Sequence, residues 1–154
     1  MKAVVQRVKY ASVTVENETV GKIDQGFLVL LGVGKGDTEA EADLLASKIA
    51  KMRVFCDENG KMNLSLNQVG GEILVISQFT LYANCVHGNR PDFFASEGPV
   101  RANELYEYFT DKVKSISECK TEKGVFGADM KVELLNDGPV TIILDTDELL
   151  KRKA

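Results

Sequence analysis

Two short, uninterrupted runs of apolar residues most constrain what this chain can fold into. Residues 27–31 read Phe-Leu-Val-Leu-Leu, and residues 73–76 read Ile-Leu-Val-Ile. A strand that is apolar at every position has both of its faces covered, whereas a strand with one solvated face alternates apolar and polar side chains. The two runs therefore predict central strands of a sheet that carries further layers on both sides. Both are far too short to span a bilayer.

Two amphipathic helices are predicted to supply part of this covering. Thr38 and Glu41 have the spacing of a capping box, which predicts a helix that starts at this point. A second helix is expected to begin near Pro99. Each segment repeats apolar residues at helical spacing and so predicts one buried stripe: Ala42, Leu45, Ile49 and Met52 in the first helix, and Leu105, Phe109, Val113 and Ile116 in the second.

Further strands are predicted where apolar and polar residues alternate or where short apolar segments flank a turn. The alternation covers residues 11–15 and 130–134, and a last strand is expected at 140–144. Together these segments predict about seven strands and an α+β fold. Because no repeat, linker or low-complexity segment divides the chain, residues 1–154 are expected to form a single domain, with only residues 151–154 fraying.

Composition limits the partners and the compartment of the protein. The net charge of the 154 residues is −4, whereas proteins that grip long nucleic acids through phosphates are normally basic, so any nucleic-acid contact is expected to be local. Gln6 and Arg7 stand where a signal peptide needs an apolar stretch. The widely spaced cysteines Cys56, Cys85 and Cys119 favour free thiols in a reducing cytoplasm. We therefore expect a soluble, cytoplasmic protein that does not engage a membrane.

Several common catalytic patterns are missing from the sequence. His87 is the single histidine and lies in a polar loop, and no G-x-S-x-G stretch is present, which disfavours a Ser-His-Asp triad. Residues 32–36, Gly-Val-Gly-Lys-Gly, lack the spacing of known phosphate loops and are interpreted as a strand-to-helix connection. No paired histidine ligands occur. Neither a metal nor a cofactor is therefore predicted.

Two other stretches are less easily explained by structure alone. The second apolar run leads into Ser77-Gln78-Phe79-Thr80, so a buried strand ends in polar groups that need partners or line a pocket. Residues 136–141 read Asn-Asp-Gly-Pro-Val-Thr, and a glycine before a proline permits unusual backbone angles. The spacing by itself leaves a structural role open for the first stretch and an ordinary turn for the second.

Together, the two stretches resemble the signature motifs of the D-aminoacyl-tRNA deacylase family, Ser-Gln-Phe-Thr and Asn-x-Gly-Pro-Val-Thr. The resemblance continues in order through residues 3–8, 11–15, 60–65, 70–74, 90–93 and 124–130, and only the tail from residue 149 lies outside it. It implies a fold layered α/β/β, with mostly antiparallel, barrel-like sheets and two main helices packed outside. It also implies a homodimer with active sites at the subunit interface.

The resemblance assigns roles to residues at matching positions. The catalytic floor of the pocket is expected at Ser77, Gln78, Phe79 and Thr80. A cis Gly-Pro bond is expected to enter the pocket of the partner subunit, where its carbonyls leave no room for an L side chain; this chiral filter comprises Gly138, Pro139, Asn136, Val140 and Thr141. The 3′ end of the tRNA is expected at Phe126, Gly127, Ala128, Met130 and Arg7, with a base stacked on the phenyl ring. Further candidates for phosphate contacts are Lys9 and Arg90.

The implied activity is hydrolysis of the ester bond of D-aminoacyl-tRNA, and of glycyl-tRNA mischarged on tRNA-Ala, with rejection of L-amino acids. Two mechanisms are open: attack by the Thr80 hydroxyl, or attack by a water molecule. The sequence supplies no base for Thr80, which favours a water activated by the 2′-hydroxyl of the tRNA, with backbone N–H groups around Phe79 stabilising the oxyanion. The alternatives are an editing domain for small L-amino acids and a non-catalytic dimer that binds tRNA ends.

Overall fold

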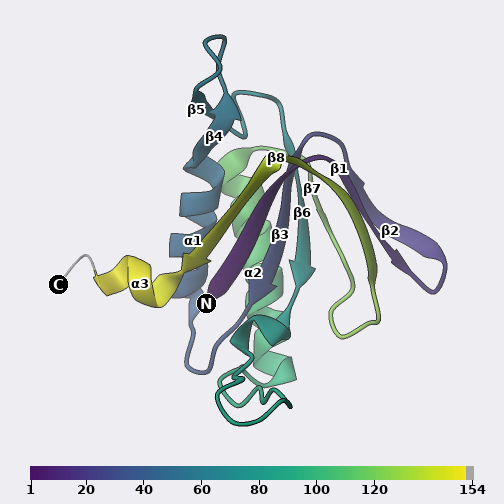
Figure 1. Cartoon of the computed structure of the whole chain (residues 1–154), viewed down its shortest axis with the longest axis vertical. Helices are drawn as coiled ribbons and strands as arrows, with labels where there is room; N and C mark the ends of the chain where they lie inside the picture. Colours follow the sequence, from purple (N-terminus) through teal and green to yellow (C-terminus); the bar gives the residue numbers. More distant parts are fainter. Residues whose placement is uncertain (152–154) are drawn as a thin grey trace.

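The described part of the chain, residues 1–151 of a computed structural model, contains eight β-strands, three α-helices and one 3-10 helix (Figure 1). The strands are β1 Lys2–Val15, β2 Glu18–Ile23, β3 Gly26–Gly32, β4 Arg53–Cys56, β5 Met62–Ser65, β6 Glu72–Ser77, β7 Thr121–Lys123 and β8 Lys131–Asp145. The helices are α1 Glu39–Lys51, the 3-10 helix η1 Phe79–Tyr82, α2 Pro99–Ser117 and α3 Thr146–Lys151. Of the residues 151–154 expected to fray, Lys151 is the last residue of α3, and residues 152–154 lie outside the described residues.

One mixed sheet holds six of these strands, in the order β2-β1-β3-β6-β7, with β8 paired to β1. β1 pairs antiparallel with β2, β3 and β8, whereas the β3–β6 and β6–β7 pairs are parallel. The first half of β1 pairs with β3 and its second half with β2, while β8 follows both halves. In Figure 1 β1 and β8 curve together, and this curvature gives the sheet its barrel-like shape. β4 and β5 form a separate antiparallel hairpin.

The sheet is covered on both faces, as the apolar runs predict. On one face Phe27 and Val29 of β3 pack into a core that includes the buried stripes of α1 and α2. On the other face Leu28 packs with Leu74 of β6 and Val13 from the curled half of β1 in a second core. Neighbouring residues of one strand thus belong to different cores, which explains why the run is apolar throughout. The predicted α/β/β layering is confirmed.

Both predicted helices are confirmed, and their first turns show why they begin where they do. Thr38 caps α1, and the carboxylate of Glu41 accepts a hydrogen bond from the Thr38 N–H at 2.7 Å, which completes the capping box. α2 begins at Pro99, a position where a missing N–H leaves no hydrogen bond unmade. The predicted stripes are buried except at their ends, where Met52 and Ile116 are half-buried.

The C-terminal region differs from the two separate strands that the sequence predicts. β8 continues as a single strand because β1 is long enough to pair with it before and after the Gly138-Pro139 pair. The β1–β8 register shifts at two places, between Thr141 and Asn136 and again between Asn136 and Leu134. The sequence pattern also missed β7 and α3, because three and six residues are too few to display a period.

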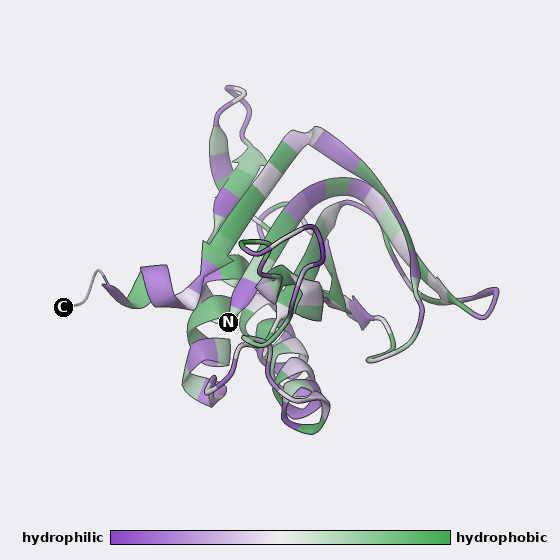
Figure 2. Cartoon of the chain, turned by 60° about the horizontal axis from the view of Figure 1, so that its bottom comes forward, coloured by the Kyte–Doolittle hydropathy of each residue, from purple (hydrophilic) through white to green (hydrophobic). Residues whose placement is uncertain are grey.

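Hydrophilic residues occupy the tips of the β1–β2 and β4–β5 hairpins, which project from the body of the protein (Figure 2). At the tip between β1 and β2, Glu16 and Asn17 have positive φ angles of 50° and 65°, which suit the twist of a two-residue hairpin turn. Within residues 1–151, no helix combines the length and the apolar character needed to cross a membrane.

Candidate active site

A pocket of about 600 Å³ opens where β6 ends, between the start of α2 and the β7–β8 connection. Two stretches that lie far apart in the sequence meet in it: Ser77, Gln78 and Phe79 on one side, and residues 126–130 on the other. The remaining lining is mostly apolar, and an apolar cavity with a few polar groups is the usual form of a small-molecule site. The pocket therefore joins the stretch predicted for catalysis to the stretch predicted for the tRNA 3′ end.

The first stretch is held where β6 passes into η1. The N–H of Gln78 donates to the carbonyl of Leu31 at 2.7 Å, which extends the β3–β6 pairing beyond the strand. Phe79 is 57% exposed, and its ring packs edge-on against Phe93 with 5.1 Å between centroids. Thr80 is exposed beside the pocket and does not line it. In the described structure the backbone N–H groups of Phe79 and Thr80 have no hydrogen-bond acceptor, as is usual at the start of a helix.

The polar contacts of Thr80 bear directly on its chemistry. Its hydroxyl accepts a hydrogen bond from the side-chain amide of Gln78. An amide cannot take up a proton at neutral pH, so this contact positions the hydroxyl without activating it as a nucleophile. His87, the single histidine, lies exposed in the loop of residues 83–92 and does not line the pocket.

Residues 126–130 form the facing wall of the pocket. Phe126 is half-buried, and its ring lies 6.0 Å from that of Tyr106 in α2. The hydroxyl of Tyr106 donates to a backbone carbonyl of β6 at 2.8 Å, and burial raises the pKa of this phenol, so it remains a neutral donor. Gly124 lets residues 126–130 pack close to β6, because a Cβ there would lie 2.5 Å from the sulfur of Met130 and 3.1 Å from a methyl group of Ile76. Phe126 is thus backed by a fixed aromatic ring.

The second motif forms an exposed turn within β8 and does not line the pocket of its own chain. The Gly138–Pro139 peptide bond is cis, and Gly138 has a φ of 130°. The side-chain amide of Asn136 spans the turn: it donates to the hydroxyl of Thr141 and accepts from the N–H of Val140, each at 3.3 Å. These two bonds explain why the motif combines an amide at its start with a hydroxyl at its end.

Arg7 lies against this turn and away from Phe126. Its guanidinium donates to the carbonyl of Val54 at 2.8 Å and to the carbonyl of Asp137 at 3.1 Å. The carboxylate of Asp137 lies 3.8 Å from Arg7 and 3.6 Å from Lys9. The structure therefore does not bring Arg7 together with the other residues predicted at the 3′ end, and in a single subunit its contacts support the turn.

The remaining candidates and the residues that sequence reasoning missed can be placed as well. Arg90 is exposed on the loop outside the pocket. Phe93 lines the pocket, although the sequence marked it only as part of the resemblance at residues 90–93. Glu97 also lines it; hydrogen bonds from the N–H groups of Gly98 and Gly36 lower the pKa of its carboxyl and keep it ionised. Among the described residues no cluster of three or more histidine, cysteine or acidic side chains could hold a metal ion.

Solved structures give the class to which this fold belongs. A protein described as c-Myc DNA Unwinding Element Binding Protein superimposes with a TM-score of 0.86 and is 44% identical, with 94% of this chain and 98% of that chain covered. A probable eukaryotic D-amino acid tRNA deacylase superimposes with a TM-score of 0.81 over the same shares, and at 15% identity it supports the fold alone. The predicted deacylase-like fold is confirmed.

Sequence comparison gives the family. The sequence model of the family described as D-Tyr-tRNA(Tyr) deacylase matches residues 4–145, and the chain belongs to this family. D-aminoacyl-tRNA deacylases of Thermosipho melanesiensis and Dictyoglomus turgidum are 53% and 54% identical to it, covering 97% and 98% of this chain and 99% and 96% of their own. That of Koribacter versatilis is 57% identical over 95% of this chain and 97% of its own length. Membership makes the chain a hydrolase, as the sequence predicts.

Proposed function

We propose that this chain hydrolyses the ester bond between tRNA and a D-amino acid or glycine, and leaves L-aminoacyl-tRNA intact. The observation that carries the proposal is the meeting of the Ser77-Gln78-Phe79 stretch and the Phe126 wall in one pocket. The first offers groups for the reacting ester, and the second offers a surface for the nucleoside that carries it. Family membership supports the same activity. Glycyl-tRNA mischarged on tRNA-Ala is included because glycine has no side chain to exclude.

The terminal adenosine of the tRNA is assigned to the Phe126 wall. A base that stacks on an aromatic side chain gains about 1–3 kcal/mol, and Tyr106 backs this ring at 6.0 Å so that it need not be ordered on binding. The pocket of about 600 Å³ lies within the usual range for ligand sites. Local recognition of this kind suits a protein with a net charge of −4, because only a short single-stranded end has to be held.

The chemical step is assigned to a water molecule. Its oxygen attacks the ester carbonyl carbon, the bond to the ribose oxygen breaks, and that oxygen takes up a proton. The unpaired N–H groups of Phe79 and Thr80 are suited to the oxyanion that forms on the way, and one such donor is typically worth about 3 kcal/mol. Because the Thr80 hydroxyl is bonded to an amide rather than to a base, the neighbouring 2′-hydroxyl of the tRNA is the better candidate for orienting the water.

Rejection of L-amino acids is assigned to Gly138 and Pro139 of a second copy of the chain. The turn is exposed and does not line its own pocket. Hydrogen bonds from Arg7 to the Asp137 carbonyl and from the Val140 N–H to the side chain of Asn136 nevertheless fix its conformation. A backbone carbonyl held in this way cannot rotate aside as a side chain can, so it can exclude an L side chain by its position alone. D-amino acids and glycine present only a hydrogen atom there.

A homodimer is supported by the outer face and edge of β8. Within residues 1–151 this strand pairs only with β1, so its other edge has no partner strand. Ile143 and Leu135 on β8 are 74% and 49% exposed, although both are large and apolar. A second copy packed here would cover these side chains and pair the edge. A cytoplasmic location remains a prediction.

Subunit mixing tests whether the filter acts across the interface. Chains with Gly138→Ala are dissociated and reassociated with chains that carry Phe126→Ala, and hydrolysis of D-Tyr-tRNA is measured at low substrate concentration. If the filter acts in the partner's pocket, half of the dimers are mixed and each has one intact site, which restores about a quarter of the wild-type activity. A filter that acts within its own chain restores none. The absence of any activity in the unaltered protein would favour a non-catalytic dimer that binds tRNA ends.

A further inference from the structure

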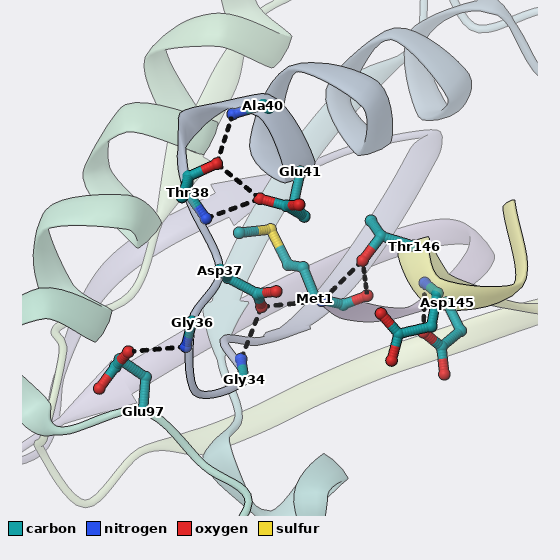
Figure 3. A network of polar contacts seen from close by, with 11 residues as sticks. Met1, Gly34, Gly36, Asp37, Thr38, Ala40, Glu41, Glu97, Asp145 and Thr146 are labelled. Atoms are coloured by element: carbon teal, nitrogen blue, oxygen red, sulfur yellow. Dashed lines mark hydrogen bonds and ion pairs between the residues drawn. The ribbon is translucent and has the colours of Figure 1, made fainter. Parts of the chain in front are cut away.

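The α-ammonium of Met1 lies inside the protein rather than at its surface, and Figure 3 shows it between Asp37 and Thr146. Met1 is 1% exposed, whereas chain termini usually lie at the surface. The nitrogen is 2.8 Å from the carboxylate of Asp37, and it donates to the hydroxyl of Thr146 at 2.8 Å. Thr146 is fully buried as well. The amine therefore occupies a closed site with two oxygen partners.

The partners of this site suit a charged amine and no acylated form of it. The hydroxyl of Thr146 accepts from the ammonium and donates to the Met1 carbonyl at 3.2 Å, and the Thr146 N–H donates to the same carbonyl at 2.9 Å. An ammonium brings three N–H donors and a positive charge for Asp37. An N-acyl amide brings one donor and no charge, and its carbonyl oxygen would be enclosed among acceptors. Acylation would thus leave the largely buried carboxylate of Asp37, 10% exposed, without its counterion.

Asp37 connects this site to the part of the pocket lined by Val33 and Glu97. The same carboxylate oxygen accepts the N–H of Gly34 at 2.7 Å. The loop that follows β3 is tied to residues 95–97 by two backbone hydrogen bonds, from Lys35 to the carbonyl of residue 95 at 3.0 Å and from Glu97 to the carbonyl of Val33 at 2.9 Å. Val33 and Glu97 both line the pocket. Asp37 therefore joins the amine to a loop that forms part of the pocket.

We propose that, in a chain that begins at Met1, the free α-ammonium positions the part of the pocket lined by Val33 and Glu97, and that an acyl group on this nitrogen leaves these two residues without a fixed position. The smallest such group is the formyl group with which bacterial chains begin. Its removal is an amide hydrolysis: water adds across the C–N bond, formate leaves, and the amine takes up a proton. For a chain that begins at Met1, this reaction must precede full activity. The effect on catalysis rests on the proposed deacylase function, while the effect on folding does not.

The test compares the protein with a free amine and with N-formyl Met1, prepared from cells in which deformylation is blocked and verified by mass. Because a buried ion pair is lost, the formylated protein should melt roughly 6–20 °C lower. Well below both melting temperatures, its kcat/KM for D-Tyr-tRNA should fall about threefold or more, mainly through KM. Hydrogen exchange at the N–H groups of Lys35 and Glu97 should become faster.

Substitutions distinguish loss of the Met1–Asp37 ion pair from a general effect of removing a negative charge. Asp37→Asn should reproduce the lower melting temperature and the kinetic change, and formylation should then add little, because the pair is already broken. Thr146→Val offers a second disruption if Asp37→Asn does not fold. Asp111→Asn on the exposed side of α2 changes the same type of side chain and should leave melting and kinetics as they are.

Two results would overturn the proposal. If the formylated protein melts at the same temperature as the free form, the ammonium is not needed for stability. If the formylated protein is less stable but hydrogen exchange at Lys35 and Glu97 is unchanged, the amine site is not coupled to this part of the pocket. If the unmodified protein does not hydrolyse D-aminoacyl-tRNA, the proposed function fails. The melting and exchange measurements then still decide the role of the amine.

Discussion

Replacement of Gly138 by alanine probes the turn that is assigned to chiral rejection. With a φ of 130°, Gly138 has a backbone conformation that L residues rarely adopt, and such a residue costs about 1–3 kcal/mol. The added Cβ would lie 2.9 Å from a methyl group of Val140 and 3.1 Å from a guanidinium nitrogen of Arg7, so the turn has to shift. For a chain of this length the melting temperature should fall by roughly 2–12 °C.

The effect of Gly138→Ala on activity should exceed its effect on stability. The methyl group and the shifted carbonyls would narrow the space for the α-carbon of the substrate, and displacements of this kind reduce rates by about 10–100-fold. Gly60→Ala is the matched control, because Gly60 also has a positive φ, of 75°, but nothing lies within 4 Å of its would-be Cβ. It should lose stability and keep its activity. Wild-type hydrolysis of D-Tyr-tRNA by folded Gly138→Ala would refute the reasoning.

Three further substitutions test the other assignments. Thr80→Ala should lose less than tenfold in kcat, because water attacks; a loss of about a thousandfold, typical for removal of a catalytic group, would instead indicate a threonine nucleophile. Phe126→Ala should raise KM about 5–150-fold, the equivalent of one stacked base, with little change in kcat, and an unchanged KM would remove the adenosine from this wall. Asn136→Ala removes both side-chain bonds across the turn and should lower the free energy of unfolding by about 1–3 kcal/mol, measured by urea titration; an unchanged midpoint would show that the turn does not depend on them.

Local chemistry made much of the fold predictable. The capping box at Thr38 and Glu41 formed as expected because both of its partners lie within one helical turn. The apolar runs at residues 27–31 and 73–76 implied cores on both sides of the sheet, and both cores are present. The continuity of β8 could not be read in the same way, because it depends on the length of β1, its distant partner. Pairing across more than one hundred residues leaves no periodic signal at the break.

The site was predictable in its parts more than in its arrangement. The polar groups at the end of β6 were noticeable because a buried strand rarely ends in them. Ser77 and Gln78 do line the pocket, whereas Thr80 lies beside it. Arg7 was grouped with Phe126 by resemblance, whereas the structure places it against the Asp137 carbonyl. Glu97 was missed because a single acidic residue in a loop carries no spacing signal, and only the packing of two loops brings it to the pocket.

The most direct test of the proposed function is hydrolysis of matched D-Tyr-tRNA, Gly-tRNA and L-Tyr-tRNA by the purified protein in the presence of EDTA. We predict cleavage of the first two substrates and no cleavage of the third. Equal cleavage of L-Tyr-tRNA would contradict the role assigned to Gly138 and Pro139 while leaving the fold intact. Failure to cleave any of the three would contradict the proposed activity itself.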